Sequence, residues 1–256
     1  MTKFKSIAVL MGIMALASCE KNGVQDITGV TPDAKIRFFN FALNAPSVNF
    51  FANDTKVTAI LSSAGTPVST GVVYGGVAAG GLYSGVAAGT YQFSAQISDT
   101  NIKNVTVAKV SQAIVAGKTY SFFTSGLYDA TTRTSDGFIV EDNYPTTFDY
   151  TQALVRFVNA IYNSTPMTLY AKNQVTGVET AIGGAIAYKS AGAFVGLPNG
   201  VYDLSTRVTG STTNVIVRTA VGFAQGSVYT IGARGDITIV STTATNRPFL
   251  DNTANR

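Results

Sequence analysis

The segment Ala34-Lys-Ile-Arg-Phe-Phe-Asn40 is the most informative stretch of this chain, because a similar segment follows as Ala153-Leu-Val-Arg-Phe-Val-Asn159. The alanine, the arginine, the first phenylalanine and the asparagine recur in the same places, and the same offset then sets Val48–Ala52 on Met167–Ala171. Self-similarity at a fixed offset is the signature of a repeated structural unit. The chain therefore consists of two copies of one unit.

Two later segments extend the repeat. Ala88-Gly-Thr-Tyr-Gln-Phe93 matches Asn199-Gly-Val-Tyr-Asp-Leu204, and Ala116-Gly-Lys-Thr-Tyr-Ser-Phe122 matches Gln225-Gly-Ser-Val-Tyr-Thr-Ile231. The offset shortens along the chain, which indicates that the second copy has shorter loops.

The matched segments alternate between apolar and polar residues. Tyr91, Phe93, Ala95 and Ile97 form one row, and polar residues stand between them. A period of two with one polar face predicts half-buried antiparallel strands. About seven or eight such strands per copy, separated by Gly, Asn, Pro or Ser, predict an all-β protein of two tandem immunoglobulin-like antiparallel β-sandwiches. A small barrel is the alternative.

The repeat also sets the expected organisation of the chain. Phe138–Val140 and Ile237–Ile239 are expected to be the last strand of each copy. The expected segments are a signal peptide (1–18), a lipidated tether (19–33), a first sandwich (34–142), a linker (143–152), a second sandwich (153–242) and a C-terminal tail (243–256).

The N-terminus predicts export and a membrane anchor. Lys3 and Lys5 precede an apolar run that is too short to span a bilayer but fits a signal peptide. The run ends in Leu16-Ala17-Ser18-Cys19, which resembles the bacterial lipobox. The resemblance implies a diacylglyceryl group on Cys19 and cleavage after Ser18. We therefore expect an exported lipoprotein held to a membrane, in particular the outer membrane, by its acyl chains, with the face left open. A secreted protein with a chance cysteine is the alternative.

The ordered set of motifs resembles the bacterial domain of unknown function 4397. The segments that carry the resemblance are Ala34 to Asn40, Asn44-Ala-Pro46, Val48 to Asn53, Ala87-Ala-Gly-Thr-Tyr91 and Ala116-Gly-Lys-Thr-Tyr120. The second copy departs more, with Leu197-Pro-Asn-Gly-Val-Tyr202 for the first tyrosine turn. The resemblance implies an extracytoplasmic lipoprotein with tandem modules, and it transfers no catalytic or binding residue.

The composition excludes several classes of function. The chain has no His, no Trp and one Cys. A zinc site built from several Cys or His ligands, a Ser-His-Asp or Cys-His catalytic apparatus and an intrachain disulfide are therefore excluded. The formal net charge is +4, and loss of Lys3 and Lys5 with the signal peptide would lower it by two. No run of Lys or Arg is present, so we expect no nucleic-acid partner.

Two sequence motifs resemble binding sites, one for phosphate and one for calcium, but both are better interpreted as ordinary structural segments. Gly117-Lys-Thr119 lacks the glycine that a phosphate-binding loop needs five places earlier, where Gln112 stands, and it precedes a strand. The densest acidic neighbourhood would suit calcium, but it has no Asp-x-Asp-x-Asp spacing, so a solvated domain junction is the favoured interpretation. Its residues are Asp136, Glu141, Asp142 and Asp149. We expect no metal and no cofactor.

Aromatic residues on the polar faces of strands are the candidate binding surface. Phe51 and Tyr170 share one repeat position, opposite Phe50 and Leu169, and Phe39 lies on the equivalent face of its own strand. Aromatic groups that remain on a solvent face indicate a binding patch. The competing interpretation is that the two domains, or a covering loop, bury them.

These observations together favour a non-enzymatic protein. We expect a membrane-anchored envelope protein whose sandwiches bind or display, with another envelope protein or a polysaccharide as partner. A purely structural spacer is one alternative. A hydrolase that uses two carboxylates alone is the other. The 14 acidic residues of the chain make a chance pair of carboxylates easy to find, so such a pair gives little support to this alternative.

Overall fold

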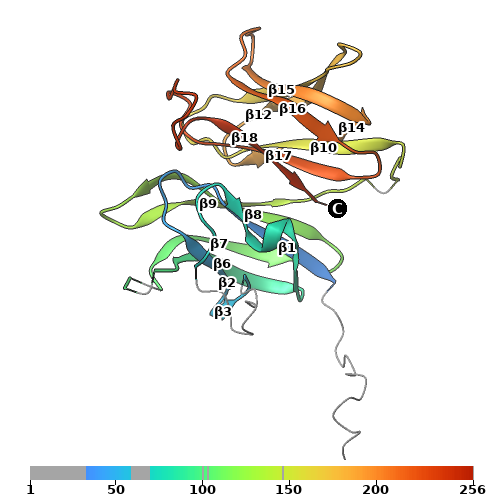
Figure 1. The fold of residues 1–256 in the computed structure, drawn as a ribbon. Helices are drawn as coiled ribbons and strands as arrows, with labels where there is room; N and C mark the ends of the chain where they lie inside the picture. The colour runs from blue at the N-terminus through green and yellow to red at the C-terminus, as the bar shows by residue number, and fades with distance from the viewer. Residues whose placement is uncertain (1–32, 59–69, 100, 103, 146, 256) are drawn as a thin grey trace, which may run out of the picture. The chain divides into compact units, whose positions relative to one another are not determined.

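The computed structural model describes residues 33–58, 70–99, 101–102, 104–145 and 147–255 (Figure 1). Cys19, the expected signal peptide and nearly all of the expected tether lie outside the described residues. Within the described residues, no helix is long and apolar enough to cross a membrane.

The two copies form the same strands in the same order. The described part of the first copy contains β1 (Ala34–Asn40), β2 (Val48–Ala52), β3 (Thr55–Lys56), β4 (Gly76–Val77), β5 (Ser84–Val86), β6 (Gly89–Ile97), β7 (Thr106–Ile114), β8 (Thr119–Asp129) and β9 (Thr134–Glu141). The second contains β10 (Gln152–Asn159), β11 (Met167–Asn173), β12 (Glu179–Ile186), β13 (Ser190–Ala191), β14 (Val195–Pro198), β15 (Gly200–Val208), β16 (Ile216–Phe223), β17 (Val228–Arg234) and β18 (Phe249–Ala254). A short 3-10 segment, η2 (Ala78–Gly81), lies between β4 and β5.

Each copy is a two-layered β-sandwich. In the first, β4-β1-β8-β9 form one sheet, with β5 also paired to β1, and β3-β2-β6-β7 form the other. In the second, the corresponding sheets are β13-β10-β17-β18, with β14 on β10, and β12-β11-β15-β16. The prediction of two tandem all-β sandwiches is confirmed. The sheets are mostly antiparallel, as expected, and each copy has one parallel pair, β1 with β8 and β10 with β17. Parallel neighbours are possible there because a long stretch of chain separates the two strands.

The end of the second sandwich also differs from expectation. Ile237–Ile239 is not a strand, and the last strand is β18, which pairs antiparallel with β17. The interpretation of 243–256 as a tail outside the fold is therefore wrong. The sequence hides β18 because only Leu250 among its central residues enters the core, whereas Asp251 faces Arg234 in an ion pair.

The sheets that contain β1 and β10 are buried on both faces. In β1, Ile36 and Phe38 enter the core of their own sandwich, and Phe38 stacks on Phe50 with ring centroids 5.0 Å apart. Arg37 and Phe39 alternate with them and are equally buried on the opposite face. We call these two sheets the inner sheets and the β2 and β11 sheets the outer sheets, because the inner sheets pack against each other (Figure 1).

Phenylalanines of the first sandwich fill the space between the inner sheets. Phe39 stacks on Phe123 with ring centroids 4.3 Å apart. The repeat positions of Phe39, Phe41 and Phe123 are held in the second sandwich by Val158, Ala160 and Gly232. A Cβ at Gly232 would lie 2.6 Å from the ring of Phe41. Large side chains on one inner sheet thus pack against small ones on the other. Both sandwiches belong to one compact unit, Pro32–Arg256.

We expect Phe123→Ala to lower the free energy of unfolding by about 3–5 kcal/mol, because it opens a cavity in the middle of this layer. Phe51→Ala, which removes a half-buried ring from an outer sheet, is the matched control and should cost clearly less. Urea unfolding followed by circular dichroism measures both values. Equal losses for the two variants would show that the layer between the sandwiches contributes no more than an outer face.

Candidate functional site

Two buried arginines lie at the centre of the contact between the sandwiches. Arg37 in β1 and Arg156 in β10 hold the same repeat position and are 0% and 1% exposed. Strand alternation turns them away from the two cores and toward the opposite inner sheet. A buried guanidinium must have its donors satisfied, since leaving a buried charge without partners is costly.

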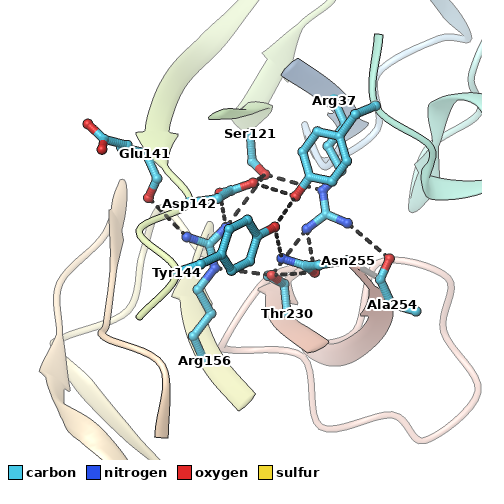
Figure 2. A network of polar contacts seen from close by, with 10 residues as sticks. Arg37, Ser121, Glu141, Asp142, Tyr144, Arg156, Thr230, Ala254 and Asn255 are labelled. Carbon is cyan, nitrogen blue, oxygen red and sulfur yellow. Dashed lines mark hydrogen bonds and ion pairs between the residues drawn. The ribbon is translucent and has the colours of Figure 1, made fainter. Parts of the chain in front are cut away.

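Each arginine donates to the end of the last strand of the other sandwich (Figure 2). Arg37 Nη1 donates to the carbonyl of Ala254 at 3.1 Å, and its Nη2 donates to Oδ1 of Asn255 at 2.6 Å. Arg156 Nη1 donates to the carbonyl of Glu141 at 3.1 Å, and its Nη2 donates to the Asp142 carboxylate. The strand registers make Ala254 the counterpart of Glu141, so the two halves of the network are equivalent.

Two hydroxyls join the halves. Ser121 in β8 and Thr230 in β17 occupy equivalent positions. Arg37 donates to both, at 3.3 Å to Ser121 Oγ and 3.2 Å to Thr230 Oγ1. Arg156 also donates to both, at 3.1 Å to Thr230 Oγ1 and 3.5 Å to Ser121 Oγ. Each sandwich therefore supplies acceptors to the arginine of the other.

An aromatic ring covers each guanidinium. The Cζ of Arg37 lies 4.7 Å from the centroid of Tyr83, and the Cζ of Arg156 lies 4.9 Å from that of Phe194. Tyr83 and Phe194 are again equivalent, since each directly precedes the short strand beside β1 or β10. The faces of aromatic rings attract cations, and more strongly where water is excluded.

The two halves of the network place their residues at equivalent positions, but only the first half contains a carboxylate. Asp142 stands in the first half where Asn255 stands in the second, so two buried cations share one buried carboxylate. Asp142 also accepts bonds from Tyr83 Oη at 2.6 Å and from Ser121 Oγ at 2.8 Å. Among the described residues, Arg37 donates only to neutral acceptors. Burial lowers the pKa of Arg37, and burial together with the charge of Asp142 raises the pKa of Tyr83 above its ordinary value.

A pocket of about 720 Å³ opens beside the network, and we call it the junction pocket. Tyr83, Tyr144 and Asn255 belong to both features. The hydroxyls of Tyr83 and Tyr144 lie 2.8 Å apart. Asn255 Nδ2 donates to the Tyr144 hydroxyl at 3.2 Å, and Figure 2 shows this pair. The remaining lining includes Lys35, Thr119, Phe148, Tyr150 and Val228.

The geometry of Ser121 and Asp142 gives no catalytic arrangement. Ser121 Oγ donates to the carboxylate, but that carboxylate is paired with Arg156, and both residues are buried. A serine nucleophile needs an accessible hydroxyl and a base free to take its proton. The junction pocket instead offers hydroxyls, an amide, a lysine and aromatic rings, which are groups suited to binding a ligand by hydrogen bonds, charge and stacking.

The structure does not bring the three aromatic candidates together. Phe39 is 1% exposed and packs against Phe123, so its assignment to an exposed binding surface is wrong. The reason is that the inner face of β1 is covered by the second sandwich. Phe51 and Tyr170 are half-buried in two different outer sheets, and the guanidinium of Arg207 covers the Tyr170 ring at 4.3 Å.

The four acidic residues considered for calcium turn to different partners. Asp142 meets Arg156, Glu141 meets Lys118 at 2.9 Å, Asp136 meets Lys189 at 3.0 Å, and Asp149 accepts a bond from Thr151 at 2.6 Å. In the part of the chain that the structure describes, no three acidic, histidine or cysteine residues form a group suited to a metal ion.

Sequence reasoning did not recognise the arginine pair as a site. Both arginines were visible in the repeat, but an arginine that alternates with apolar residues ordinarily marks a solvent face. The available signal was its return at the same position of both copies. Asp142 stands out in the sequence only as one of four neighbouring acidic residues, and Asn255 gives no signal because the pattern of β18 does not predict a strand.

We expect Asn255→Asp to stabilise the protein by about 1–3 kcal/mol, because it gives Arg37 the charged acceptor that Arg156 already has. Asn199→Asp adds the same charge at an exposed turn and should change stability by less than about 0.5 kcal/mol. Thermal unfolding at neutral pH compares the two. A loss of stability in Asn255→Asp alone would show that the second cation needs no carboxylate.

We expect Asp142→Asn to cost about 3–5 kcal/mol, because both buried arginines then lack a carboxylate. The double variant Asp142→Asn with Arg156→Met should regain part of this loss, since it removes the uncompensated charge. The same unfolding measurement applies, and an additive double variant would contradict the pairing.

Comparison with known proteins gives a family and a distant structural likeness. The sequence profile described as "Domain of unknown function (DUF4397)" matches residues 34–160 and 153–256. A crystal structure from Bacteroides ovatus, described as that of "a putative cell adhesion protein", is similar at 10% sequence identity and a TM-score of 0.23, over 88% of this chain and 96% of that one. A likeness at this level carries no argument about function. A search of curated proteins finds no match.

Proposed function

The chain belongs to the domain of unknown function (DUF4397) family, in two tandem copies, and from this premise we propose that it is a non-enzymatic binding protein of the bacterial cell envelope. In this proposal Cys19 carries the acyl chains that anchor the protein to the outer membrane. The paired sandwiches then present a binding site to an envelope protein or polysaccharide.

The junction pocket is the observation that carries the proposal. Its volume of about 720 Å³ falls within the range of about 300–1,000 Å³ that is usual for small-molecule sites. Both sandwiches and the segment between them contribute to its lining, with Thr119 from the first, Val228 from the second and Tyr144 between. Aromatic walls with a few polar groups are the composition that such sites share.

A structural spacer is the second candidate, and the contact between the inner sheets favours it. Stacked phenylalanines and exchanged arginine bonds fix one sandwich on the other, as a spacer requires. The two candidates differ at the junction pocket. A binding protein loses its ligand when the pocket lining is changed, whereas a spacer tolerates the change.

The anchor is tested by Cys19→Ala. We expect the wild-type protein to incorporate radiolabelled palmitate and to sediment with membranes, and the variant to lose the label and appear in the soluble fraction. Each acyl methylene buried in the bilayer contributes about 0.8 kcal/mol, so loss of the acyl chains removes the attachment. A variant that still sediments with membranes would contradict the anchor.

Binding and location are tested on cells. We expect protease treatment of intact cells, with lysed cells as control, to release peptides of residues 34–256 if the sandwiches face outward.

Affinity capture of solubilised envelope polysaccharide and protein by the purified lipoprotein then tests binding, with Tyr150→Ala as the pocket variant. Capture that is unchanged in this variant would favour another surface, and no capture at all would favour the spacer.

A further inference from the structure

We propose that the junction pocket binds a carboxylated sugar, with its pyranose ring against the aromatic wall and its carboxylate near Lys35. This inference rests on the proposed function and deepens it, because it names the class of ligand. It is drawn from the charges and rings that surround the pocket.

The electrostatics of the junction pocket favour an anion. Of the described residues that line it, none is acidic, and Lys35 is its one cationic side chain. Tyr83 and Asn255 stand between the pocket and Arg37, touching both. The buried network behind them holds two arginines and one carboxylate, so it carries a net positive charge. Charges act over longer range where water is displaced by protein, and an anion in the pocket would offset this excess.

The aromatic wall favours a ring with apolar faces. Tyr150 is 63% exposed, Phe148 packs edge-on against it with centroids 4.7 Å apart, and Tyr144 stacks on Phe194 at 5.2 Å. The Tyr150 side chain is therefore largely accessible to a ligand, while Phe148 packs against its ring. The C–H faces of a pyranose fit such a surface, and stacking there adds to affinity through burial of apolar area.

The hydrogen-bonding groups of the pocket favour hydroxylated ligands. The Tyr83 and Tyr144 hydroxyls, the Thr119 hydroxyl and the Asn255 amide include both donors and acceptors. A sugar presents several hydroxyls that donate and accept in the same way. A simple inorganic anion would use Lys35 but leave the aromatic wall unused, so a uronic acid is the ligand that uses all three features.

The experiment compares trigalacturonate with its trimethyl ester by isothermal titration calorimetry on the full lipoprotein in detergent. The ester keeps the rings and hydroxyls but removes the charge. We expect the acid to bind at least about tenfold more tightly than the ester, with the difference shrinking as salt increases. Equal affinities for the two would overturn the charge argument.

Two variants with matched controls locate the site. Lys35→Gln should weaken binding of the acid about tenfold and leave the ester unchanged, whereas Lys109→Gln on the exposed side of β7 should change neither. Tyr150→Ala should weaken both ligands, whereas Tyr170→Ala in the outer sheet of the second sandwich should weaken neither. Loss of binding in Tyr170→Ala but not in Tyr150→Ala would place the sugar on the other surface and overturn the pocket.

The same titrations separate failure of this inference from failure of the proposed function. If neither trigalacturonate nor its ester binds, the inference falls. The proposed function then still stands if the lipoprotein captures envelope material and Tyr150→Ala abolishes that capture. If wild type captures nothing, both fall together.

Discussion

Two buried arginines, each bound by acceptors of the other sandwich, fix how the two copies pack together. Arg37 and Arg156 lie on the inner faces of their own sheets, but their strongest acceptors belong to the other copy. A guanidinium taken out of water must find partners for its donors, and here neither sandwich alone supplies them. The two copies therefore complete each other, and the inner sheets are buried on both faces as a result.

The differences between the copies matter as much as their likeness. Phe39, Phe41 and Phe123 meet small residues at the equivalent positions of the other copy, so first copies placed against each other would crowd six rings into this layer. Second copies placed against each other would bury two arginines with no carboxylate, since Asn255 replaces Asp142. Packing and charge thus both select the pairing of unlike copies within one chain.

The junction pocket follows from that pairing. Tyr83 and Thr119 come from the first sandwich and Asn255 from the second, while Tyr144 and Tyr150 come from the segment expected to be only a linker. In this segment Tyr144 packs on Phe194 and Tyr150 packs on Phe148, and both tyrosines thereby line the pocket. The hydroxyl chain from Asp142 through Tyr83 and Tyr144 to Asn255 links the pocket to the buried arginines.

The repeat, the strands and the cores can be predicted from the amino-acid sequence, because alternation in segments such as Ala34–Asn40 depends on local geometry alone. The sequence also excludes catalysis by a Ser-His-Asp or Cys-His apparatus, since the chain has no His, and an intrachain disulfide, since it has one Cys. The three-dimensional structure was needed to show that Phe39 is buried, that Arg37 and Arg156 bind acceptors in the other copy and that β18 closes the second sandwich. Each of these depends on what covers the second face of a strand, and a single strand's pattern does not distinguish solvent from another sheet that supplies polar partners.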